Sequence, residues 1–198
     1  MSDLFSTPAI ATQPIDGEKG RRERGAFYTP DALARAITRS LGKNIAQPRT
    51  ILEPGCGGGA FLRAAHEEWS SASLLGVDTV PACVGPGRVE HRDLFTVHDK
   101  FDLIVGNPDF GVAEQVVRHC MALLEPRGCL ALLLRISFLC SLSRVPLYRE
   151  FPLRFFQPIA GRPSFTGGGS DTSEYGLFVW KPAGWLYASE ILPPLEWK

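Results

Sequence analysis

The sequence predicts an α/β fold, with a mostly parallel sheet that has helices on both faces. Short apolar runs alternate along the 198-residue chain with segments whose apolar residues recur every three or four positions. The runs are apolar at almost every position, which is typical of strands buried on both faces. Strands and helices that alternate in this way build a parallel sheet between two layers of helices.

The first helix is predicted over residues 30–41. Thr29 is the expected N-cap, Pro30 suits the first helical position, and Gly42 is the expected stop signal. Three apolar residues spaced four apart give this segment one apolar face.

Further elements follow at regular intervals. Helices are predicted over residues 60–69 and from about 112 to 124. The predicted strands lie at residues 50–52, 74–77, 88–91, 101–105, 129–134 and 175–180. A Pro-Arg-Gly turn at 126–128 leads into the fifth strand. Residues 144–163 are rich in proline, glycine and aromatic side chains, and we expect residues 164–173 to form a flexible loop.

The domain organisation predicted from this pattern is simple. Residues 1–20 form a disordered tail, and residues 21–198 form a single domain without a separate target-recognition domain. The first twenty residues lack the pattern of a secretory signal, and no apolar run approaches the roughly 18 residues that a membrane span needs. We therefore expect no membrane association.

The cysteines favour a reducing compartment. Five are scattered through the chain, and none forms a Cys-x-x-Cys pair or a cluster with histidine. A disulfide framework and a zinc site are therefore not expected, and a cytoplasmic location is predicted.

The charge distribution is uneven although the formal net charge is zero. Between residues 118 and 162 the chain carries seven arginines and two acidic residues, a net charge of +5. Such a run forms either a solvated face or a surface that meets phosphates, and the sequence leaves both open.

A glycine-rich turn follows the first predicted strand. Gly55, Gly57 and Ala60 have the spacing of a nucleotide-binding turn that leads from a strand into a helix. The start of that helix is expected to offer free N–H groups to an anion. Asp78, at the end of the next strand, can reach ribose hydroxyls. The alternatives are a structural turn and, for Asp78, a helix cap.

Asn107-Pro108-Asp109-Phe110 ends an apolar strand at the edge where α/β folds place their sites. The Asn107 side-chain oxygen and the Pro108 carbonyl can accept both N–H bonds of an aromatic amine, which frees its lone pair. Phe110 can stack on the ring that carries the amine. The alternative is an ordinary turn that begins with Asn-Pro.

Together these motifs resemble class I S-adenosylmethionine-dependent methyltransferases, and within them the amino-methyltransferases of DNA. The resemblance covers about residues 25–181 and implies a seven-stranded, mostly parallel sheet with an antiparallel last strand. It implies S-adenosylmethionine as the cofactor, with Phe27 to Pro30 over its methionine half. The implied cofactor-binding residues are Phe27, Tyr28, Thr29, Pro30, Glu53, Pro54, Gly55, Cys56, Gly57, Phe61, Asp78, Asp93, Leu94 and Asn107.

The resemblance also implies a catalytic segment and a substrate. Asn107, Pro108, Asp109 and Phe110 are the implied catalytic residues. The segment 162–171 is similar to small N6-adenine enzymes, in which Phe165 would pack against a flipped base. Phe110 and Arg135 are the other expected substrate contacts, and the arginines from 135 to 162 would hold the nucleic-acid backbone.

One departure from the family concerns the second proline of the catalytic motif, which is Asp109 here. The ring that would lock this peptide plane is absent, and a carboxylate lies beside the site.

The resulting prediction is methyl transfer to an exocyclic amine, N6 of adenine in DNA, without a metal. Three alternatives stay open. The first is methyl transfer to an RNA base or a protein glutamine. The second is a cofactor-binding subunit without catalysis, and the third is an NAD-dependent oxidoreductase. A protein partner would supply target recognition if the chain itself does not.

Overall fold

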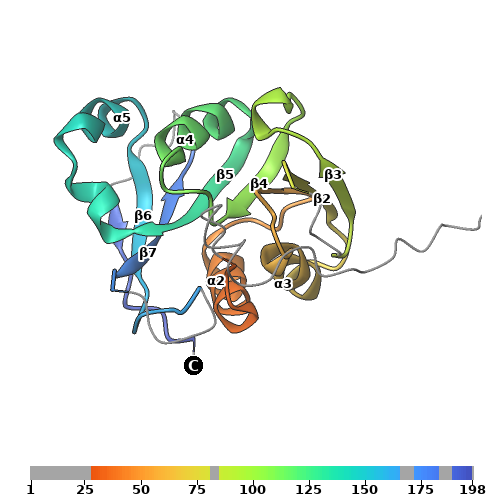
Figure 1. The fold of residues 1–198 in the computed structure, drawn as a ribbon, viewed down its shortest axis with the longest axis horizontal. Helices are drawn as coiled ribbons and strands as arrows, with labels where there is room; N and C mark the ends of the chain where they lie inside the picture. The colour runs from red at the N-terminus through yellow and green to blue at the C-terminus, as the bar shows by residue number, and fades with distance from the viewer. Residues whose placement is uncertain (1–27, 81–84, 166–171, 183–188, 198) are drawn as a thin grey trace, which may run out of the picture.

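The computed structural model describes residues 28–80, 85–165, 172–182 and 189–197. Phe27, the predicted tail 1–20 and residues 166–171 of the glycine-rich loop lie outside the described residues. The described chain forms one eight-stranded sheet with helices on both faces (Figure 1).

The elements follow one another in alternation for most of the chain. The strands are β1 (Thr50–Pro54), β2 (Ser73–Asp78), β3 (Arg88–His91), β4 (Phe101–Gly106), β5 (Leu124–Arg135), β6 (Leu153–Pro158), β7 (Tyr175–Trp180) and β8 (Glu190–Ile191). The helices are α2 (Asp31–Asn44), α3 (Ala60–Glu68), α4 (Ala113–Ala122) and α5 (Val145–Glu150), with short 3-10 turns η1 (Leu94–Thr96), η2 (Ile136–Cys140) and η3 (Leu142–Arg144).

The strand order is β3-β2-β1-β4-β5-β7-β6-β8. All pairs are parallel except those of β7, which runs antiparallel to both β5 and β6. The predicted fold class is therefore confirmed. Two details differ, because the two-residue strand β8 brings the sheet to eight strands, and the antiparallel strand is the seventh rather than the last.

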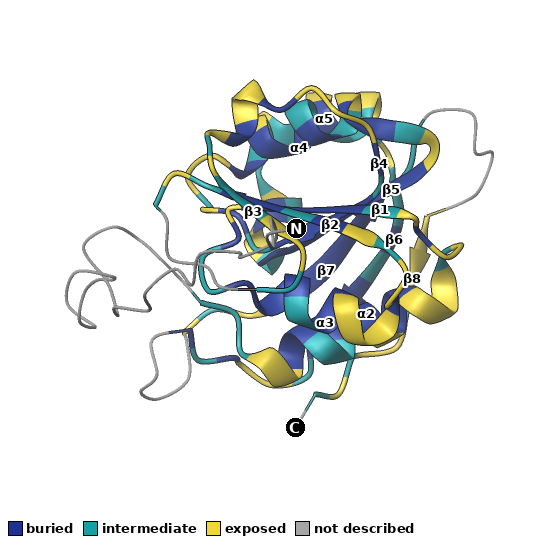
Figure 2. Cartoon of the chain, turned by 90° about the vertical axis from the view of Figure 1, so that its right-hand side faces the viewer, coloured by how far each residue is buried: buried dark blue, intermediate teal, exposed yellow. Residues whose placement is uncertain are grey.

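The core lies on both faces of the sheet, and β5 shows why its sequence is apolar throughout. Cys129, Ala131 and Leu133 belong to the core on the side of α2 and α3. The alternate residues Leu130, Leu132 and Leu134 belong to the core on the side of α4 and α5. Since successive strand residues point to opposite faces, both helix layers require apolar partners from this strand (Figure 2).

Helix α2 begins and ends later than predicted. Its N-cap is Pro30 rather than Thr29, without a side-chain cap, and the helix continues past Gly42 to Asn44. A Cβ built at Gly42 would lie 2.5 Å from the Glu68 carboxylate at the end of α3. Gly42 is thus a residue inside the helix that faces the Glu68 side chain, and the prediction of a stop at Gly42 was wrong.

Most of the other predicted elements are confirmed to within a few residues. The Pro-Arg-Gly turn at 126–128 is a bulge inside β5, where the register shifts between the pairs Phe101–Leu124 and Leu103–Cys129. Sequence patterns missed α5, β6 and β8. No helix among the described residues is long and apolar enough to cross a membrane.

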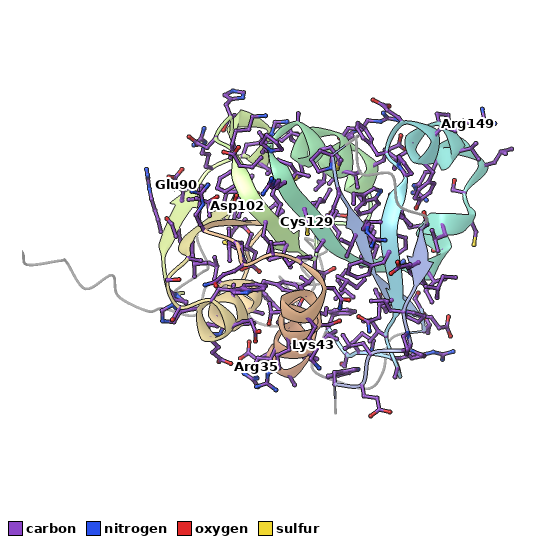
Figure 3. The ribbon with its side chains drawn as sticks, turned by 180° about the vertical axis from the view of Figure 1, so that it is seen from behind. Arg35, Lys43, Glu90, Asp102, Cys129 and Arg149 are labelled. Carbon is purple, nitrogen blue, oxygen red and sulfur yellow. The ribbon has the colours of Figure 1, made fainter. Side chains whose placement is uncertain are left out.

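The topology brings two strand ends together. β1 lies between β2 and β4, and the connections reverse direction between β1 and β4. Ligands in open α/β sheets bind at the carboxyl ends of the strands at such a switch point. Asp102 lies at the other end of the strands, near the start of β4 (labelled in Figure 3). Its carboxylate accepts from the N–H groups of Arg49 at 2.8 Å and Thr50 at 3.2 Å, and so joins the amino ends of β1 and β4.

Candidate active site

The loop from β1 to α3 has a backbone that only glycine adopts readily. Gly55, Gly57 and Gly59 have φ angles of 61°, 46° and 72°. A Cβ built at Gly55 would meet nothing within 4 Å, and the residue is exposed. The Cys56 side chain instead turns inward, against Gly76 of β2. The loop thus presents bare backbone to solvent at the switch point.

Glu53, the fourth residue of β1, caps the following helix from within the core. Its carboxylate accepts from the N–H groups of Phe61 at 3.3 Å and Leu62 at 2.8 Å. The negative charge also favours the positive end of the α3 dipole. Two of the N–H groups that were predicted to be free for an anion at this helix start therefore already have the Glu53 carboxylate as their acceptor. Phe61, a predicted cofactor contact, is buried in the core.

Asp78 ends β2 and reaches back to the glycine loop. One carboxylate oxygen accepts from Gly57 N at 2.8 Å, and the other accepts from Val80 N at 2.8 Å. The side chain is only partly buried, and an ionised carboxylate has about four acceptor positions. Asp78 therefore fixes the loop and still has acceptor capacity for hydroxyl groups.

The N-terminal segment lies against the same loop. A Cβ built at Gly57 would be 2.8 Å from the Tyr28 ring, and one built at Gly58 would be 3.3 Å away. Arg63 of α3 ties this arrangement together, because it donates to Asp31 at 2.6 Å and to the Gly58 carbonyl at 2.5 Å. Tyr28 and the loop, which are far apart in sequence, thus form one surface.

Asp93 caps the short turn η1 after β3. Its Oδ1 atom accepts from Phe95 N at 3.0 Å. Leu94 is buried, while Phe95 is exposed and meets the His119 ring edge-on at 5.4 Å between centroids. The structure thus places Asp93 and Leu94 at the carboxyl end of β3, two strands away from the glycine loop.

The segment Asn107–Phe110 leaves β4 beside the glycine loop. A Cβ built at Gly106 would lie 3.2 Å from Pro54 O, so the two strand ends are in contact. Pro108 is buried and Asp109 is exposed. Asp109 Oδ1 accepts from Gly111 N at 2.8 Å, and its carbonyl accepts from Val112 N at 3.2 Å. The carboxylate thus closes its own turn before α4.

The predicted substrate residues gather around Tyr175. Its ring lies 5.8 Å from that of Phe110 and 4.9 Å from that of Phe165, between centroids. Arg135 places its guanidinium 4.7 Å from the Phe110 centroid and donates from Nε to the Tyr175 hydroxyl at 3.4 Å. Tyr175 itself was not predicted, because a tyrosine at the start of a buried strand has no sequence signal that separates a site residue from a core residue.

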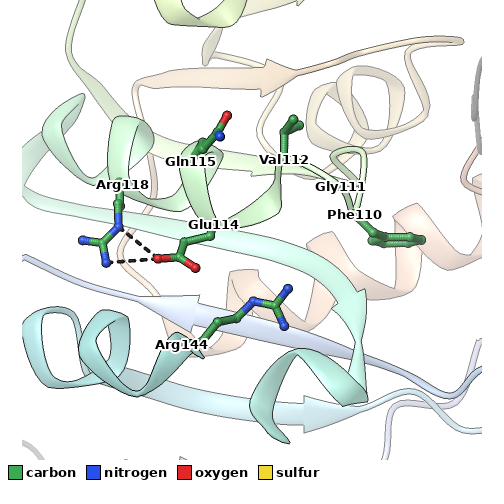
Figure 4. A pocket seen from close by; sticks show the side chains of 7 residues that line it. All are labelled: Phe110, Gly111, Val112, Glu114, Gln115, Arg118 and Arg144. Carbon is green, nitrogen blue, oxygen red and sulfur yellow. Dashed lines mark hydrogen bonds and ion pairs between the residues drawn. The ribbon is translucent and has the colours of Figure 1, made fainter. Parts of the chain in front are cut away.

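A pocket of about 340 Å³ opens next to Phe110. The start of α4 and the turn η3 supply its walls, as Figure 4 shows. Its two arginines have partners, because Arg118 donates to Glu114 and Glu150, and Arg144 stacks on the Phe138 ring at 4.2 Å. Hydrogen bonds to Glu150 and then Glu114 raise the pKa of Arg118.

Several arginines of the basic run are neutralised by neighbouring carboxylates. Arg118 pairs with two glutamates, Arg154 lies 3.3 Å from Glu190, and Arg162 lies 2.6 Å from Glu174. The hydrogen bond from Arg162 lowers the pKa of Glu174. These ion pairs are typical of a solvated face, and contact between the arginines from 135 to 162 and phosphates stays a prediction.

The groups at the carboxyl ends of β1 and β2 fit an adenosine-type cofactor. They include exposed glycine backbone at Gly55, a carboxylate at Asp78 and aromatic surface at Tyr28. Among the described residues, no group of three or more His, Cys, Asp or Glu side chains could hold a metal ion.

Comparison with known sequences identifies relatives among methyltransferases. A protein-family profile described as a methyltransferase domain matches residues 24–133. The type II methyltransferase M.CvrRI of Paramecium bursaria Chlorella virus XZ-6E is 26% identical over 170 residues, 72% of this chain and 44% of that protein. A trans-aconitate 2-methyltransferase of Escherichia coli is 28% identical over 130 residues, 56% of this chain and 50% of that protein. The chain thus spans half or less of these curated relatives.

Solved structures share the fold at low identity. A class I S-adenosylmethionine-dependent methyltransferase of Listeria monocytogenes matches with a TM-score of 0.69 and 12% identity, over 84% of this chain and 65% of that one. The type I restriction-modification methyltransferase subunit of Streptococcus thermophilus gives 0.63 and 15%, over 84% and 47%. The plantazolicin methyltransferase BpumL, solved with S-adenosylhomocysteine, gives 0.53 and 12%, over 83% and 87%.

These findings agree with the geometry of the switch point. The family match covers more than half of the chain and includes the glycine loop, Asp78 and the segment after β4. The predictions of a methyltransferase and of S-adenosylmethionine as its cofactor are confirmed at this level. The chain belongs to the methyltransferase domain family and has the Rossmann-like fold of the class I enzymes.

Proposed function

We propose that this protein transfers a methyl group from S-adenosylmethionine to an exocyclic amine, N6 of adenine in DNA. One observation carries the proposal. The segment Asn107–Phe110 leaves the sheet in contact with the end of β1, and Phe110 belongs to an aromatic group with Tyr175 and Phe165. An amide oxygen, a backbone carbonyl and a stacking ring thus follow one another directly beside the cofactor loop.

These groups suit the chemistry of an aromatic amine. The lone pair of such an amine is delocalised into its ring, so the amine is a poor nucleophile. The Asn107 side-chain oxygen and the Pro108 carbonyl accept its two hydrogens, which localises the lone pair on nitrogen. The bound cofactor supplies a methyl group already activated by its sulfonium. On transfer the amine nitrogen would gain the methyl group that the cofactor loses as it becomes S-adenosylhomocysteine, and the nitrogen would release one of its protons to solvent.

Positioning is the main contribution of the protein to this reaction. Correct orientation of two reactants is worth roughly 7–11 kcal/mol. Gly55, Gly57 and Asp78 would hold the cofactor, with the Asp78 carboxylate on the ribose hydroxyls and Asp93 near the adenine amino group. Tyr28 to Pro30 would lie over the methionine half, because Tyr28 already contacts Gly57 and Gly58.

DNA is supported as the substrate by two lines of argument. The type II methyltransferase and the restriction-modification subunit are named for DNA modification systems. Phe110, partly exposed, can stack on a flipped base, which is worth roughly 1–3 kcal/mol per base. This gain offsets part of the few kcal/mol that extrusion of a base from the duplex costs. A partner protein would add target recognition.

The test is methylation of a defined substrate. Purified protein, labelled S-adenosylmethionine and unmethylated DNA are incubated, and the methylated nucleoside is identified after digestion. We expect N6-methyladenine from the wild type and a loss of at least 100-fold in Asn107→Ala. Asn44→Ala on α2, which only loses a hydrogen bond to the Ser40 carbonyl, is the matched control and should retain activity.

Other outcomes select the alternatives. Methyl transfer to RNA or to a protein glutamine, with none to DNA, would replace the substrate and keep the chemistry. Tight binding of the cofactor without turnover on nucleic acid or protein would indicate a binding subunit that lost catalysis through Asp109.

A further inference from the structure

We propose that Arg135 and Tyr175 are positioning residues that fix the Phe110 ring, and that Arg135 does not bind a DNA phosphate. The consequence for methyl transfer rests on the proposed function. The arrangement of the three side chains is a property of the folded chain and can be tested without any substrate.

The sheet places these residues opposite one another. Arg135 ends β5, Tyr175 begins β7, and the two are direct partners in the antiparallel register. The pair is closed by a hydrogen bond from Ile136 N to the Glu174 carbonyl at 3.0 Å. Directly opposed residues carry their side chains on the same face of the sheet. The register therefore brings together a guanidinium and a phenol that are 40 residues apart in the sequence.

Phe110 meets both members of the pair. The Arg135 guanidinium carbon lies 4.7 Å from the Phe110 centroid, which is within cation–π distance. The Tyr175 ring is tilted at 45° to it at 5.8 Å. Tyr175 is fully buried and is held on another side by Phe165 at 4.9 Å. Phe110 is thus in contact with a buried aromatic neighbour and with a cation over its ring, in addition to the turn that carries it.

The position of Arg135 argues against a phosphate contact. Its guanidinium plane is engaged by an aromatic ring, and Nε points to the Tyr175 hydroxyl at 3.4 Å. The side chain is also partly buried. A cation over Phe110 withdraws electron density from the ring, and a ring polarised in this way favours an electron-rich partner, such as a purine with an exocyclic amine, over an electron-poor or cationic one.

The first experiment reads the position of Phe110 directly. 4-Fluorophenylalanine is incorporated at position 110 alone, and its ¹⁹F resonance is recorded for the wild type and for Arg135→Gln, Arg135→Lys and Tyr175→Phe. We expect a shifted and broadened resonance in Arg135→Gln, a smaller change in Tyr175→Phe, and partial retention in Arg135→Lys, which keeps the cation. A resonance unchanged in Arg135→Gln would overturn the proposal, whatever the substrate is.

The second experiment separates positioning from phosphate binding. In Arg135→Gln we expect kcat on DNA to fall at least tenfold, with KM for DNA and Kd for S-adenosylhomocysteine within twofold, and partial recovery in Arg135→Lys. Arg49→Gln, at the amino end of β1 and so at the other end of the strands from the candidate site, is the control. A salt slope of DNA binding that is reduced by about one, with kcat retained, would show a phosphate contact and overturn the proposal. Wild-type protein inactive on DNA would contradict the proposed function alone, since the ¹⁹F result stands apart from it.

Discussion

Asp109 is the residue at which this chain departs from the catalytic motif of the family it resembles. Proline at this position would lock the peptide plane through its ring. Here the carboxylate accepts from Gly111 N at 2.8 Å, and the carbonyl accepts from Val112 N at 3.2 Å. A hydrogen bond to the backbone two residues on is the means by which aspartate stabilises turns. The turn is thus held by a hydrogen bond in place of a ring.

Two substitutions separate the contribution of the Asp109 hydrogen bond to the turn from the contribution of its negative charge. Asp109→Asn keeps the acceptor oxygen and removes the charge. We therefore expect methyl transfer within about threefold of the wild type and unchanged stability. The hydrogen bond to Gly111 N is retained, and a typical hydrogen bond contributes only about 1 kcal/mol to stability. Asp109→Ala loses the acceptor, so kcat should fall about tenfold. Steady-state kinetics of both variants checks this. Equal losses in both would show that the charge itself takes part.

At the scale of elements, the loop between β1 and α3 has two separate requirements. Its backbone needs positive φ angles, and its surface needs open space for a ligand. The chain offers a comparison that separates them. Gly55 and Gly161 are both exposed, have φ angles of 61° and 74°, and would each accept a Cβ without any neighbour within 4 Å. Only Gly55 lies in the cofactor loop.

Replacement of either glycine by alanine should therefore lower the free energy of unfolding by a similar amount, but the two replacements should differ in their effect on cofactor binding. Gly55→Ala and Gly161→Ala are each expected to destabilise the fold by roughly 1–2 kcal/mol, the cost of a left-handed side-chain residue. Only Gly55→Ala should weaken S-adenosylhomocysteine binding, by tenfold or more. Denaturant unfolding and titration calorimetry measure the two effects. Equal affinities in both variants would place the cofactor elsewhere.

Helix α4 and strand β5 bury two thiols. Desolvation raises the pKa of Cys120 to about 12 and that of Cys129 to about 12, with a nearby Lys181 opposing it at Cys129. Cys129 lies in the middle of β5 (Figure 3). Burial disfavours the thiolate, so the folded state holds protons that the unfolded state releases first.

This burial has an alkaline consequence. Both thiols should contribute stability in full below the ordinary thiol pKa, near 9. That contribution should then be lost progressively as pH rises toward 12. Peptide mapping after iodoacetamide treatment at pH 8 should find the exposed Cys140 alkylated well before Cys120 and Cys129. Replacement of both buried cysteines by alanine should flatten the decline in unfolding free energy above pH 9. Rapid alkylation of either one in the native protein would contradict the burial.

At the scale of the whole molecule, a buried polar chain joins three distant parts. Ser40 of α2 donates to Gln157 Oε1 at 2.6 Å, and Gln157 Nε2 donates to the Pro193 carbonyl at 3.0 Å. Gln157 lies in β6 and is buried. One side chain therefore links the helix layer, the sheet and the C-terminal segment that follows β8.

Gln157→Leu should destabilise the fold by about 1–3 kcal/mol, since it leaves a buried hydroxyl and a carbonyl without their partner. The double variant with Ser40→Ala should lose less than the sum of the two single changes, because both remove one interaction. Denaturant unfolding of the four proteins gives this coupling. Strict additivity would mean that Ser40 and Gln157 do not interact in solution.

The local pattern of the sequence was sufficient for the fold class and for most elements. β7 has the bounds that its apolar run predicts, and the glycine loop and Asn107–Phe110 lie at the ends of the expected strands. Such features depend on periodicity and turn residues within a few positions, which a sequence displays directly. Helix ends were less predictable, because a glycine is only a frequent stop signal and α2 continues past Gly42 to Asn44.

Contacts between side chains that are distant in the sequence were not predictable from local patterns. Tyr175 and Arg135 become partners through the register between β5 and β7, and Arg162 and Glu174 pair although no local pattern relates them. Glu53 caps a helix that begins seven residues later because the loop folds back on its strand. The local sequence pattern was enough to predict six of the eight strands of the sheet and the strand ends at which the candidate site lies. The side-chain contacts were decided by strand register and helix packing, which join residues that are distant in the chain.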